Sequence, residues 1–435
     1  MSKNIAVAFS NNDVAMIAWS YAGKIPKCLG FAIYRTDVQT NQRIALPAWV
    51  GFAGETNKAW DAKTTEHWPV QKFTWRDFTA VRGHSYVYEI VPMEGKPGSL
   101  TPLNNQKLTT NQVQVSPTLG NFSAYFNRGI LSTQHLAHEI PKGGSGVPNY
   151  KVLKDRIDQP GDPLRNSLAG QSIEALLSLL NRAKTEGGAC YCALYELNDP
   201  ELLQALIGAQ YVHLILANTG TDDATNEAAR QSLHESGVDI TDQFLGNGHI
   251  GHNKFIVYVD QQGTPRSVLT GSTNWTYTGL CAQSNNAVII ESTELATLYL
   301  DYWKRLKEDE AEQGASFRKS NNELFEATVD QSSVHLWFAP NTRQKTKPSK
   351  NPPTPSDMED VFEVMKSAEQ AILFLVFQTV AGRDKIITTA PKEFYFNCKV
   401  YRDRHLFIAY HILCLTIHCT SSAPRLSAPT NSRCR

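Results

Sequence analysis

The sequence predicts a protein of more than one domain, in which an all-β sandwich precedes an α/β domain. The chain has 435 residues, and at roughly 150 residues per domain this length corresponds to two or three domains. Short apolar alternations separated by turn residues fill residues 1–118, whereas amphipathic helices alternate with apolar strands from about 119 to 378. We therefore expect a sandwich over 1–118 and a mixed sheet flanked by helices over 119–378.

Charge and hydrophobicity exclude several protein classes. Lys plus Arg and Asp plus Glu both number 42, so the net charge is zero; this excludes a polybasic nucleic-acid binder or an acidic-tail protein that works through bulk charge. A hydrophobic content of 41% argues against global disorder. No apolar run reaches the length of about 18 residues that a membrane-spanning helix needs, so stable membrane insertion is not expected.

The expected location is cytoplasmic. Asn11, Asn12 and Asp13 interrupt the first apolar stretch, which therefore does not have the pattern of a secretory signal. The eight cysteines are sparse for a disulfide scaffold of this length and fit a reducing compartment.

The first 118 residues contain several short expected strands. Apolar positions alternate with polar ones over 5–9, 14–19, 31–33, 73–75 and 86–90. Trp19 would be a core tryptophan on an early strand, and Tyr86 a corner tyrosine on a late strand. This order resembles a fibronectin type III module; a generic β-sandwich is the alternative.

Helices and strands alternate in the central region. The expected helices are 172–188, 200–209, 224–237 and 294–311, and the expected strands are 189–197, 211–220, 248–260, 266–272 and 285–292. In the first of these helices Ile173, Leu176, Leu177 and Leu180 share one face, and the pair of glycines at 187–188 ends it.

A second, incomplete copy of this unit is predicted to begin near residue 332. A strand at 332–340 precedes a Pro-rich linker, a helix at 357–370 with Ser356 as its N-cap, and a strand at 371–378. Residues 379–435 differ from the rest, with nine basic residues, three acidic residues and four of the eight cysteines. We expect an irregular, basic, Cys-rich tail, and its Cys spacing lacks the CxxC unit typical of a zinc site.

One segment, 248–286, has a pattern that indicates chemistry. Alternation along a strand should place His252 and Lys254 on one face, and likewise Ser272 and Asn274. The short connection 261–265 predicts that the two strands pair as a hairpin. An imidazole, an ammonium, a hydroxyl and a carboxamide in one patch suit a phosphodiester, because lysine and asparagine can hold phosphate oxygens while imidazole attacks phosphorus.

These residues resemble the HxK…D…GSxN signature of the phospholipase D superfamily. The gap from Lys254 to Asp260 is one residue longer than is usual in that family, and the gap from Asp260 to Gly271 is four residues longer. The resemblance implies catalysis by His252, Lys254 and Asp260, with a more structural part for Asp260. It also implies phosphate binding by three residues, Gly271, Ser272 and Asn274. It implies no metal ion and no cofactor.

The second motif of this family is absent from the sequence. Family members use two motifs that meet at one site, one histidine acting as nucleophile and the other as general acid. By analogy with the first copy, the second would fall near position 434. His405, His411 and His418 are not followed two residues later by lysine, and no second GSxN occurs.

Three interpretations remain at this stage. The first is a phosphodiesterase that works through a phosphohistidine, in which a symmetric homodimer could bring two copies of His252 together. The second is a catalytically silent protein that binds phosphate groups of lipid or nucleic acid. The third is a truncated form of a two-motif enzyme. The substrate class, phospholipid or nucleic acid, stays open because the motif recognises the phosphodiester that both share.

Four further residues have a simpler expectation. His249 is interpreted as a loop histidine, and Trp275 as core packing rather than a platform for substrate stacking. Cys190 and Cys192 are expected to be buried thiols rather than a redox or metal pair.

Overall fold

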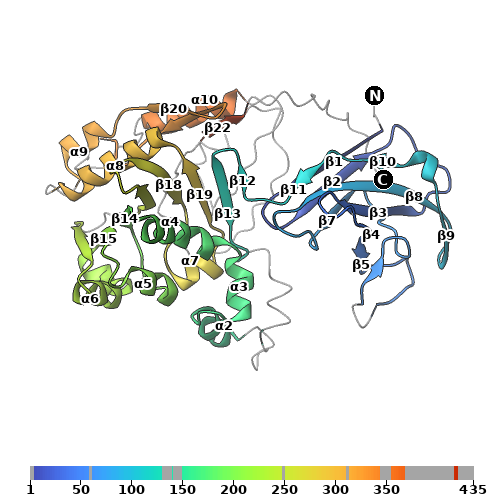
Figure 1. Cartoon of the computed structure of the whole chain (residues 1–435), viewed down its shortest axis with the longest axis horizontal. Helices are drawn as coiled ribbons and strands as arrows, with labels where there is room; N and C mark the ends of the chain where they lie inside the picture. Colours follow the sequence, from blue (N-terminus) through green and yellow to red (C-terminus); the bar gives the residue numbers. More distant parts are fainter. Residues whose placement is uncertain are drawn as a thin grey trace. The chain divides into compact units, whose positions relative to one another are not determined.

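The computed structural model describes residues 4–57, 61–129, 140, 149–246, 250–309, 313–342, 354–367 and 416–419. These residues belong to two compact units that divide after Leu119 (Figure 1). The first unit is rich in β-structure and the second is an α/β unit, so the predicted order of the two fold classes is confirmed.

Two sheets build the first unit. One contains β1 (Ile5–Ser10), β2 (Ala15–Ser20) and β7 (Thr74–Asp77). The other has the order β10 (Leu108–Thr109), β8 (Ser85–Lys96), β3 (Gly30–Asp37) and β4 (Arg43–Ala45), with β9 (Ser99–Pro102) and β11 (Val113–Gln114) also on β8. A short pair, β5 (Pro47–Ala48) and β6 (Lys63–Thr64), and the 3₁₀ helix η1 (Asn104–Gln106) complete it.

The core of this unit follows from strand alternation. Every second residue of β2 is buried, and Ile17 and Trp19 pack with Phe31 of β3 and Tyr86 of β8. The Trp19 and Phe31 rings meet edge to face with centroids 5.3 Å apart. The Tyr86 hydroxyl accepts a hydrogen bond from the Val81 backbone N–H at 3.0 Å.

A mixed sheet forms the centre of the second unit. Within this unit its order is β13 (Phe122–Phe126), β19 (Asn286–Glu291), β18 (Pro265–Gly271), β17 (Lys254–Val259), β14 (Ala189–Leu194), β15 (Val212–Asn218) and β16 (Asp239–Phe244). β14, β15 and β16 are parallel to one another, whereas β17 is antiparallel to β14 and to β18.

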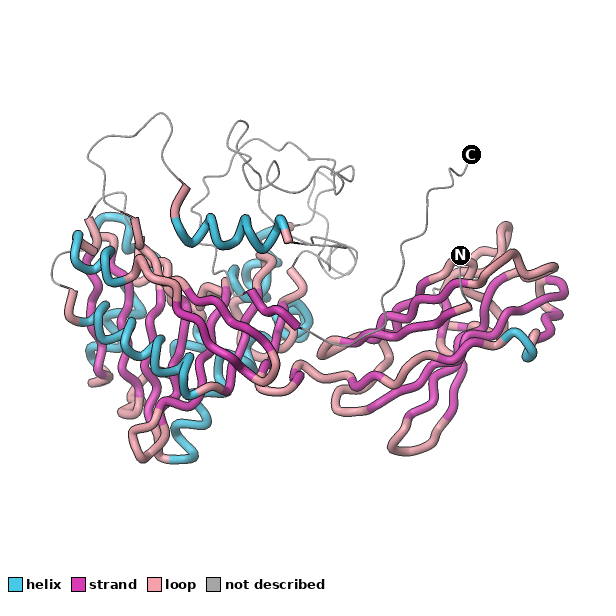
Figure 2. The backbone as a smooth tube through the Cα atoms, turned by 90° about the horizontal axis from the view of Figure 1, so that it is seen from above, coloured by secondary structure: helices cyan, strands magenta, loops and turns pink. Residues whose placement is uncertain are grey.

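Helices cover both faces of this sheet (Figure 2). The described helices are α2 (Tyr150–Ile157), α3 (Pro163–Ala169), α4 (Ser172–Glu186), α5 (Pro200–Leu206), α6 (Glu227–Glu235), α7 (Tyr277–Cys281), α8 (Thr293–Lys307), α9 (Ala315–Ser320), α10 (Ser356–Lys366) and the 3₁₀ helix η2 (Gly220–Thr225). α4 packs on the face that contains Ile256 and Tyr258 of β17, and α8 packs on the face that contains Phe255 and Val257. β17 is therefore apolar on both sides.

The predicted helix over 172–188 is confirmed as α4, and the predicted hairpin as β17–β18. α4 ends where Gly187 adopts the left-handed conformation, with φ +72°. Ser356 differs from its expected role: it is the first residue of α10, and Pro355 occupies the N-cap without a side-chain hydrogen bond. Among the described helices, none is both long and apolar enough to cross a membrane.

The region of the predicted second copy contains a separate small sheet. β20 (Phe325–Val329), β21 (Ser332–Leu336) and β22 (Thr416–Cys419) pair in that order and antiparallel. The predicted strand 371–378 and most of the predicted tail lie outside the described residues, so those expectations stay predictions.

Candidate active site

Three strand ends bring the motif residues to one edge of the sheet. β17 runs antiparallel to its two neighbours, so its first residue pairs with the last residue of β14: Lys254 lies opposite Leu194. On the other side Phe255 lies opposite Thr270, close to the end of β18. The segments that follow β14 and β18 therefore meet the segment that precedes β17.

His252, Ser272 and Asn274 lie just outside the strands, whereas Lys254 and Gly271 are terminal residues of β17 and β18. β17 begins at Lys254, so His252 stands in the connection before it, and β18 ends at Gly271, so Ser272 and Asn274 follow it. This corrects the expectation that both pairs alternate along extended strands. Side chains beyond the last hydrogen-bonded residue can turn over the sheet edge, where a ligand can reach them.

Lys254 carries an ammonium group in a buried position. The residue is 7% exposed, and Nζ donates a hydrogen bond to the backbone oxygen of His252 at 3.1 Å. Nζ also lies 5.2 Å from the centre of the Tyr195 ring. Burial lowers the pKa of Lys254 to about 7, although the negative charge of Glu196 opposes this change. Among the described residues, no carboxylate forms an ion pair with it.

His252 is half-buried beside the same tyrosine. The imidazole and the Tyr195 ring have centroids 4.7 Å apart and an interplanar angle of 54°. Tyr195 thus contacts both the candidate nucleophile and the candidate phosphate-binding ammonium. An apolar ring in this position lowers the local dielectric and strengthens the electrostatic effect of Lys254.

Asn274 presents its carboxamide to a carboxylate. The residue is 9% exposed, and Nδ2 donates to Glu196 Oε2 at 2.5 Å. Its Oδ1 is buried and has no hydrogen-bond partner among the described residues. A buried amide oxygen without a partner costs free energy, and such atoms are rare away from functional sites.

Gly271 and Ser272 determine the path of the chain where β18 ends. A Cβ on Gly271 would lie 2.3 Å from the Asn286 backbone oxygen, so only glycine permits this approach to β19. The exposed Ser272 donates its hydroxyl to Asn285 Oδ1 at 2.9 Å and accepts from the Asn286 N–H at 3.1 Å. The hydroxyl therefore orders the two strand ends.

Asp260 lies at the other end of β17. Its Oδ1 accepts from the backbone N–H groups of Gln262 and Thr264, and its Oδ2 accepts from Arg266 Nε at 2.6 Å. These bonds hold the turn of the hairpin and lower the pKa of Asp260, the backbone bond from Thr264 being the largest cause. It lies six residues after Lys254 in sequence, and an extended strand rises about 3.3 Å per residue. The structure does not bring Asp260 to the other motif residues.

Sequence reasoning missed two residues at this edge, Tyr195 and Glu196. Both follow β14 directly, and Glu196 is half-buried. Burial raises the pKa of Glu196, against the opposing effects of Lys254 and of the Asn274 hydrogen bond. The available signal was an acidic residue directly after an apolar strand, at the carboxyl end where α/β proteins place functional groups.

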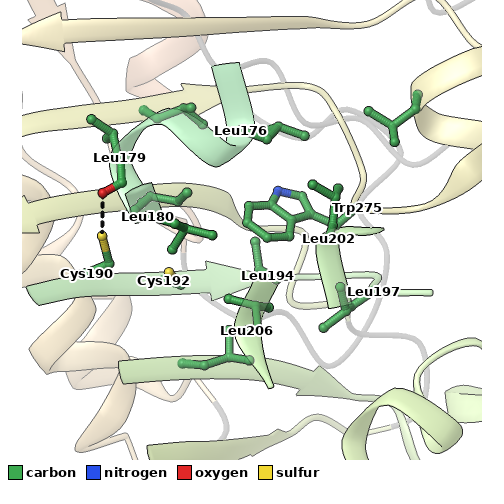
Figure 3. Close-up of a cluster of buried hydrophobic side chains, with 14 of the residues drawn as sticks. Leu176, Leu179, Leu180, Cys190, Cys192, Leu194, Leu197, Leu202, Leu206 and Trp275 are labelled. Atoms are coloured by element: carbon green, nitrogen blue, oxygen red, sulfur yellow. Dashed lines mark hydrogen bonds between the residues drawn. The ribbon is translucent and has the colours of Figure 1, made fainter. Parts of the chain in front are cut away.

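The backbone around Glu196 is held by the segment after β18. The Trp275 N–H donates to the Glu196 oxygen at 3.1 Å, and the Trp275 oxygen accepts from Asn198 N and Asp199 N. The Trp275 ring is 1% exposed and lies among Leu194, Leu197 and Leu202 (Figure 3). Its expected role in the core is confirmed, and it anchors both strand ends.

The remaining expectations concern thiols, His249 and metal ligands. Cys190 and Cys192 are fully buried, as predicted, and Cys190 Sγ donates to the Leu179 oxygen at 3.3 Å (Figure 3). His249 lies outside the described residues. Within the described ranges, no cluster of three or more His, Cys, Asp or Glu side chains could hold a metal ion.

A small polar hollow opens beside Glu196. Its lining comes from the carboxyl ends of β14 and β15 and from η2, and consists of Tyr195, Glu196, Ala217, Thr219, Asp223, Thr225 and Asn226. Asp223 is paired there with Arg230 of α6. Glu196 therefore borders a polar hollow as well as the edge of the sheet.

Comparison with solved structures finds several similar chains. Nuc from Salmonella typhimurium, described as a phospholipase D family member, is 24% identical over 29% of this chain and 83% of that chain, with a TM-score of 0.25. NucT from Helicobacter pylori is 14% identical over 32% and 90%, with a TM-score of 0.25. Yeast tyrosyl-DNA phosphodiesterase is 13% identical over 31% and 36%, with a TM-score of 0.21.

A family model matches part of the α/β unit. No curated protein matches the chain. The model of the family described as "Cardiolipin synthase, PLD-like domain" matches residues 176–307. This stretch runs from α4 to α8 and includes the edge with His252, Lys254 and Asn274. Residues 176–307 are therefore similar in sequence to phospholipase D-like domains.

Proposed function

We propose that this protein is a phosphodiesterase of the phospholipase D class, which hydrolyses a phosphodiester through a phosphohistidine. One observation supports this most strongly: the buried ammonium of Lys254 has no carboxylate in an ion pair among the described residues, and it donates to the backbone oxygen of His252. It also interacts electrostatically with Glu196, whose carboxylate accepts from Asn274. A buried cation that has no carboxylate in direct contact can be stabilised by a bound anion. The phosphodiester supplies that anion.

Each motif residue then has a defined task. An imidazole nitrogen of His252 attacks phosphorus, a P–N bond forms and the bond to the leaving oxygen breaks. Lys254 and the second N–H of Asn274 hold the non-bridging oxygens and stabilise the added charge of the transition state. Gly271 and Ser272 set the turn that presents Asn274, and Asp260 holds the hairpin. Water then cleaves the P–N bond and releases His252.

The substrate is a phosphodiester of either a phospholipid or a nucleic acid. The residues at the edge recognise the phosphate group that both classes share. A second candidate function, silent phosphate binding, is favoured by the single occurrence of the motif in the sequence. The two differ in one respect: only the enzyme forms a covalent bond to His252.

For the N-terminal unit we propose an accessory module of the fibronectin type III kind. The buried Trp19 on β2 and the hydroxyl of Tyr86, which accepts from the Val81 backbone, support this proposal. A tyrosine that bonds to the backbone a few residues upstream stabilises a corner of many β-sandwiches.

Replacing His252 by Ala is expected to lower the hydrolysis of bis(p-nitrophenyl) phosphate by at least about a hundredfold, because the nucleophile is lost. Quenching of the wild type during turnover with denaturant at alkaline pH should trap a phosphoprotein that later acid treatment hydrolyses and that His252→Ala does not form. His234→Ala is the matched control, since this half-exposed histidine lies on α6 beside Asp242. Equal rates for the two variants, or a phosphoprotein formed by His252→Ala, would contradict the proposal that His252 is the nucleophile.

Activity is expected to persist in excess EDTA. The charge of the phosphate is met by Lys254 and Asn274, so the proposed steps need no divalent ion. The measurement compares rates after dialysis against EDTA with rates after Mg²⁺ or Zn²⁺ is restored. A loss that added metal reverses would refute the phosphohistidine route as written.

A further inference from the structure

The proposed reaction needs a proton donor that the recognised motif does not contain. When the P–O bond breaks, the leaving oxygen must receive a proton unless it is a stable anion. A second imidazole is the expected donor, but the motif occurs once in the sequence. Of the groups at the edge, Lys254 is occupied with phosphate charge and His252 with attack on phosphorus. Tyr195 and Glu196 are left.

Glu196 has the better geometry for proton transfer. Its Oε2 lies 2.5 Å from Asn274 Nδ2, so the carboxyl group and a phosphate-binding amide are in direct contact. The side chain also lines the polar hollow at the ends of β14 and β15. A leaving oxygen departs from phosphorus opposite the attacking His252 nitrogen, and the proposal requires it to face this carboxyl group. The backbone bonds between Glu196 and Trp275 keep it in place.

We propose that Glu196 is the general acid of this site and supplies the proton that a second motif would otherwise supply. The inference rests on the proposed function, and it makes Glu196 a catalytic residue that neither the motif nor the family match identifies. The same carboxyl group then serves as the base for the second half of the reaction.

The proton balance is closed within one cycle. Neutral His252 attacks phosphorus and the Glu196 carboxylic acid protonates the departing oxygen, which gives an alcohol, a phosphohistidine and a carboxylate. The carboxylate then takes a proton from water as that water attacks phosphorus and the P–N bond breaks. A phosphomonoester leaves, and neutral His252 and protonated Glu196 are restored.

The electrostatic surroundings of Glu196 suit this role. Burial raises its pKa, so the acid form persists closer to neutral pH than for an exposed glutamate. The charged groups that face it are Lys254, which favours the carboxylate, and Asp223, which forms an ion pair with Arg230. Both proton-bearing forms at this edge, the Glu196 acid and the Lys254 ammonium, are lost as pH rises.

The decisive experiment compares two leaving groups in the Glu196→Gln variant. Methyl phenyl phosphate releases phenol, whose pKa near 10 makes protonation important, whereas methyl p-nitrophenyl phosphate releases a far more stable anion. We expect Glu196→Gln to lose about a hundredfold or more in rate on the phenyl ester and less than about fivefold on the nitrophenyl ester. Glutamine keeps an acceptor for Asn274 and removes only the acid.

Two further variants separate a catalytic from a structural role. Glu196→Asp retains a carboxylic acid and should keep the phenyl-to-nitrophenyl rate ratio within about fivefold of the wild-type ratio, even if both rates fall. Glu227→Gln, at an exposed position in the first turn of α6, is the matched control and should change neither rate. Glu196→Asp also serves if the glutamine variant fails to fold.

The outcomes distinguish this inference from the function on which it rests. Equal loss on both esters would show that Glu196 only orients Asn274, and no loss on either would assign the proton to another group, such as His252 of a second copy. Either result overturns the inference and leaves the phosphodiesterase intact. Wild-type protein that cleaves neither ester and traps no phosphohistidine would overturn both.

Discussion

Replacing Lys254 by Met is expected to abolish phosphodiester cleavage and at the same time to stabilise the folded protein at pH 6. Methionine matches the length and apolar stem of lysine without the charge. Loss of the ammonium should lower the rate by about 10²–10³-fold, the usual effect of removing one group that stabilises transition-state charge.

The gain in stability follows from the pKa of Lys254. Burial lowers it from the ordinary value near 10.5 to about 7 in the folded state. Between these two values the unfolded chain binds more protons than the folded one, so wild-type stability rises with pH across this window. The cost of the buried ammonium is greatest below pH 7, where Lys254→Met should add on the order of 2–4 kcal/mol to the free energy of unfolding. The gain should disappear near pH 10.

Urea denaturation of wild type and variant at pH 6 and at pH 9.5 measures this difference. Lys304→Met is the control, because Lys304 is an exposed lysine of α8 that pairs with Asp301; surface changes of this kind usually alter stability by less than about 0.5 kcal/mol. A Lys254→Met variant that is less stable than wild type at pH 6 would show that the ammonium is well paired in solution, contrary to the proposed role of Lys254 in binding phosphate.

Replacing Asp199 by Ala is expected to destabilise the α/β unit by about 4–6 kcal/mol, the largest stability effect we predict. Arg165 and Asp199 are both 0% exposed, and the guanidinium donates to both carboxylate oxygens, at 2.7 and 3.0 Å. Removing the carboxylate takes away the buried partner of the guanidinium and leaves it with the partly exposed Glu201. Asp199 is also the N-cap of α5 and accepts from the backbone N–H groups of Glu201 and Leu202.

Chemical denaturation again provides the measurement, with two companion variants. Glu201→Gln removes a second carboxylate from the same arginine, at 3.1 Å, but that side chain is 35% exposed, so the loss should stay below about 1 kcal/mol. Adding Arg165→Met to Asp199→Ala should restore part of the stability, because the buried guanidinium that lost its partner is then absent. A loss for Asp199→Ala as small as that for Glu201→Gln would refute this account.

The sequence by itself was sufficient for much of the local structure, and it indicated a type of chemistry. Apolar spacing over 172–188 and the glycine pair behind it predicted α4, because helix periodicity and a left-handed glycine are local properties. Alternation and a short turn predicted the β17–β18 hairpin in the same way. The spacing of His252, Lys254, Ser272 and Asn274 indicated phosphate chemistry before any neighbour of these residues was known.

Only the tertiary structure decided which groups lie together at the edge of the sheet and how far burial shifts their pKa values. Glu196 lies 58 positions before Lys254 and 78 before Asn274 along the chain, and they meet because β14 and β17 pair antiparallel and Trp275 is anchored beside the end of β14. Conversely, Asp260 is close to Lys254 in sequence but a full strand away in space, because an extended strand separates its ends. The pKa values of Lys254 and Glu196 depend on burial by residues from several elements, a property that no local sequence pattern contains.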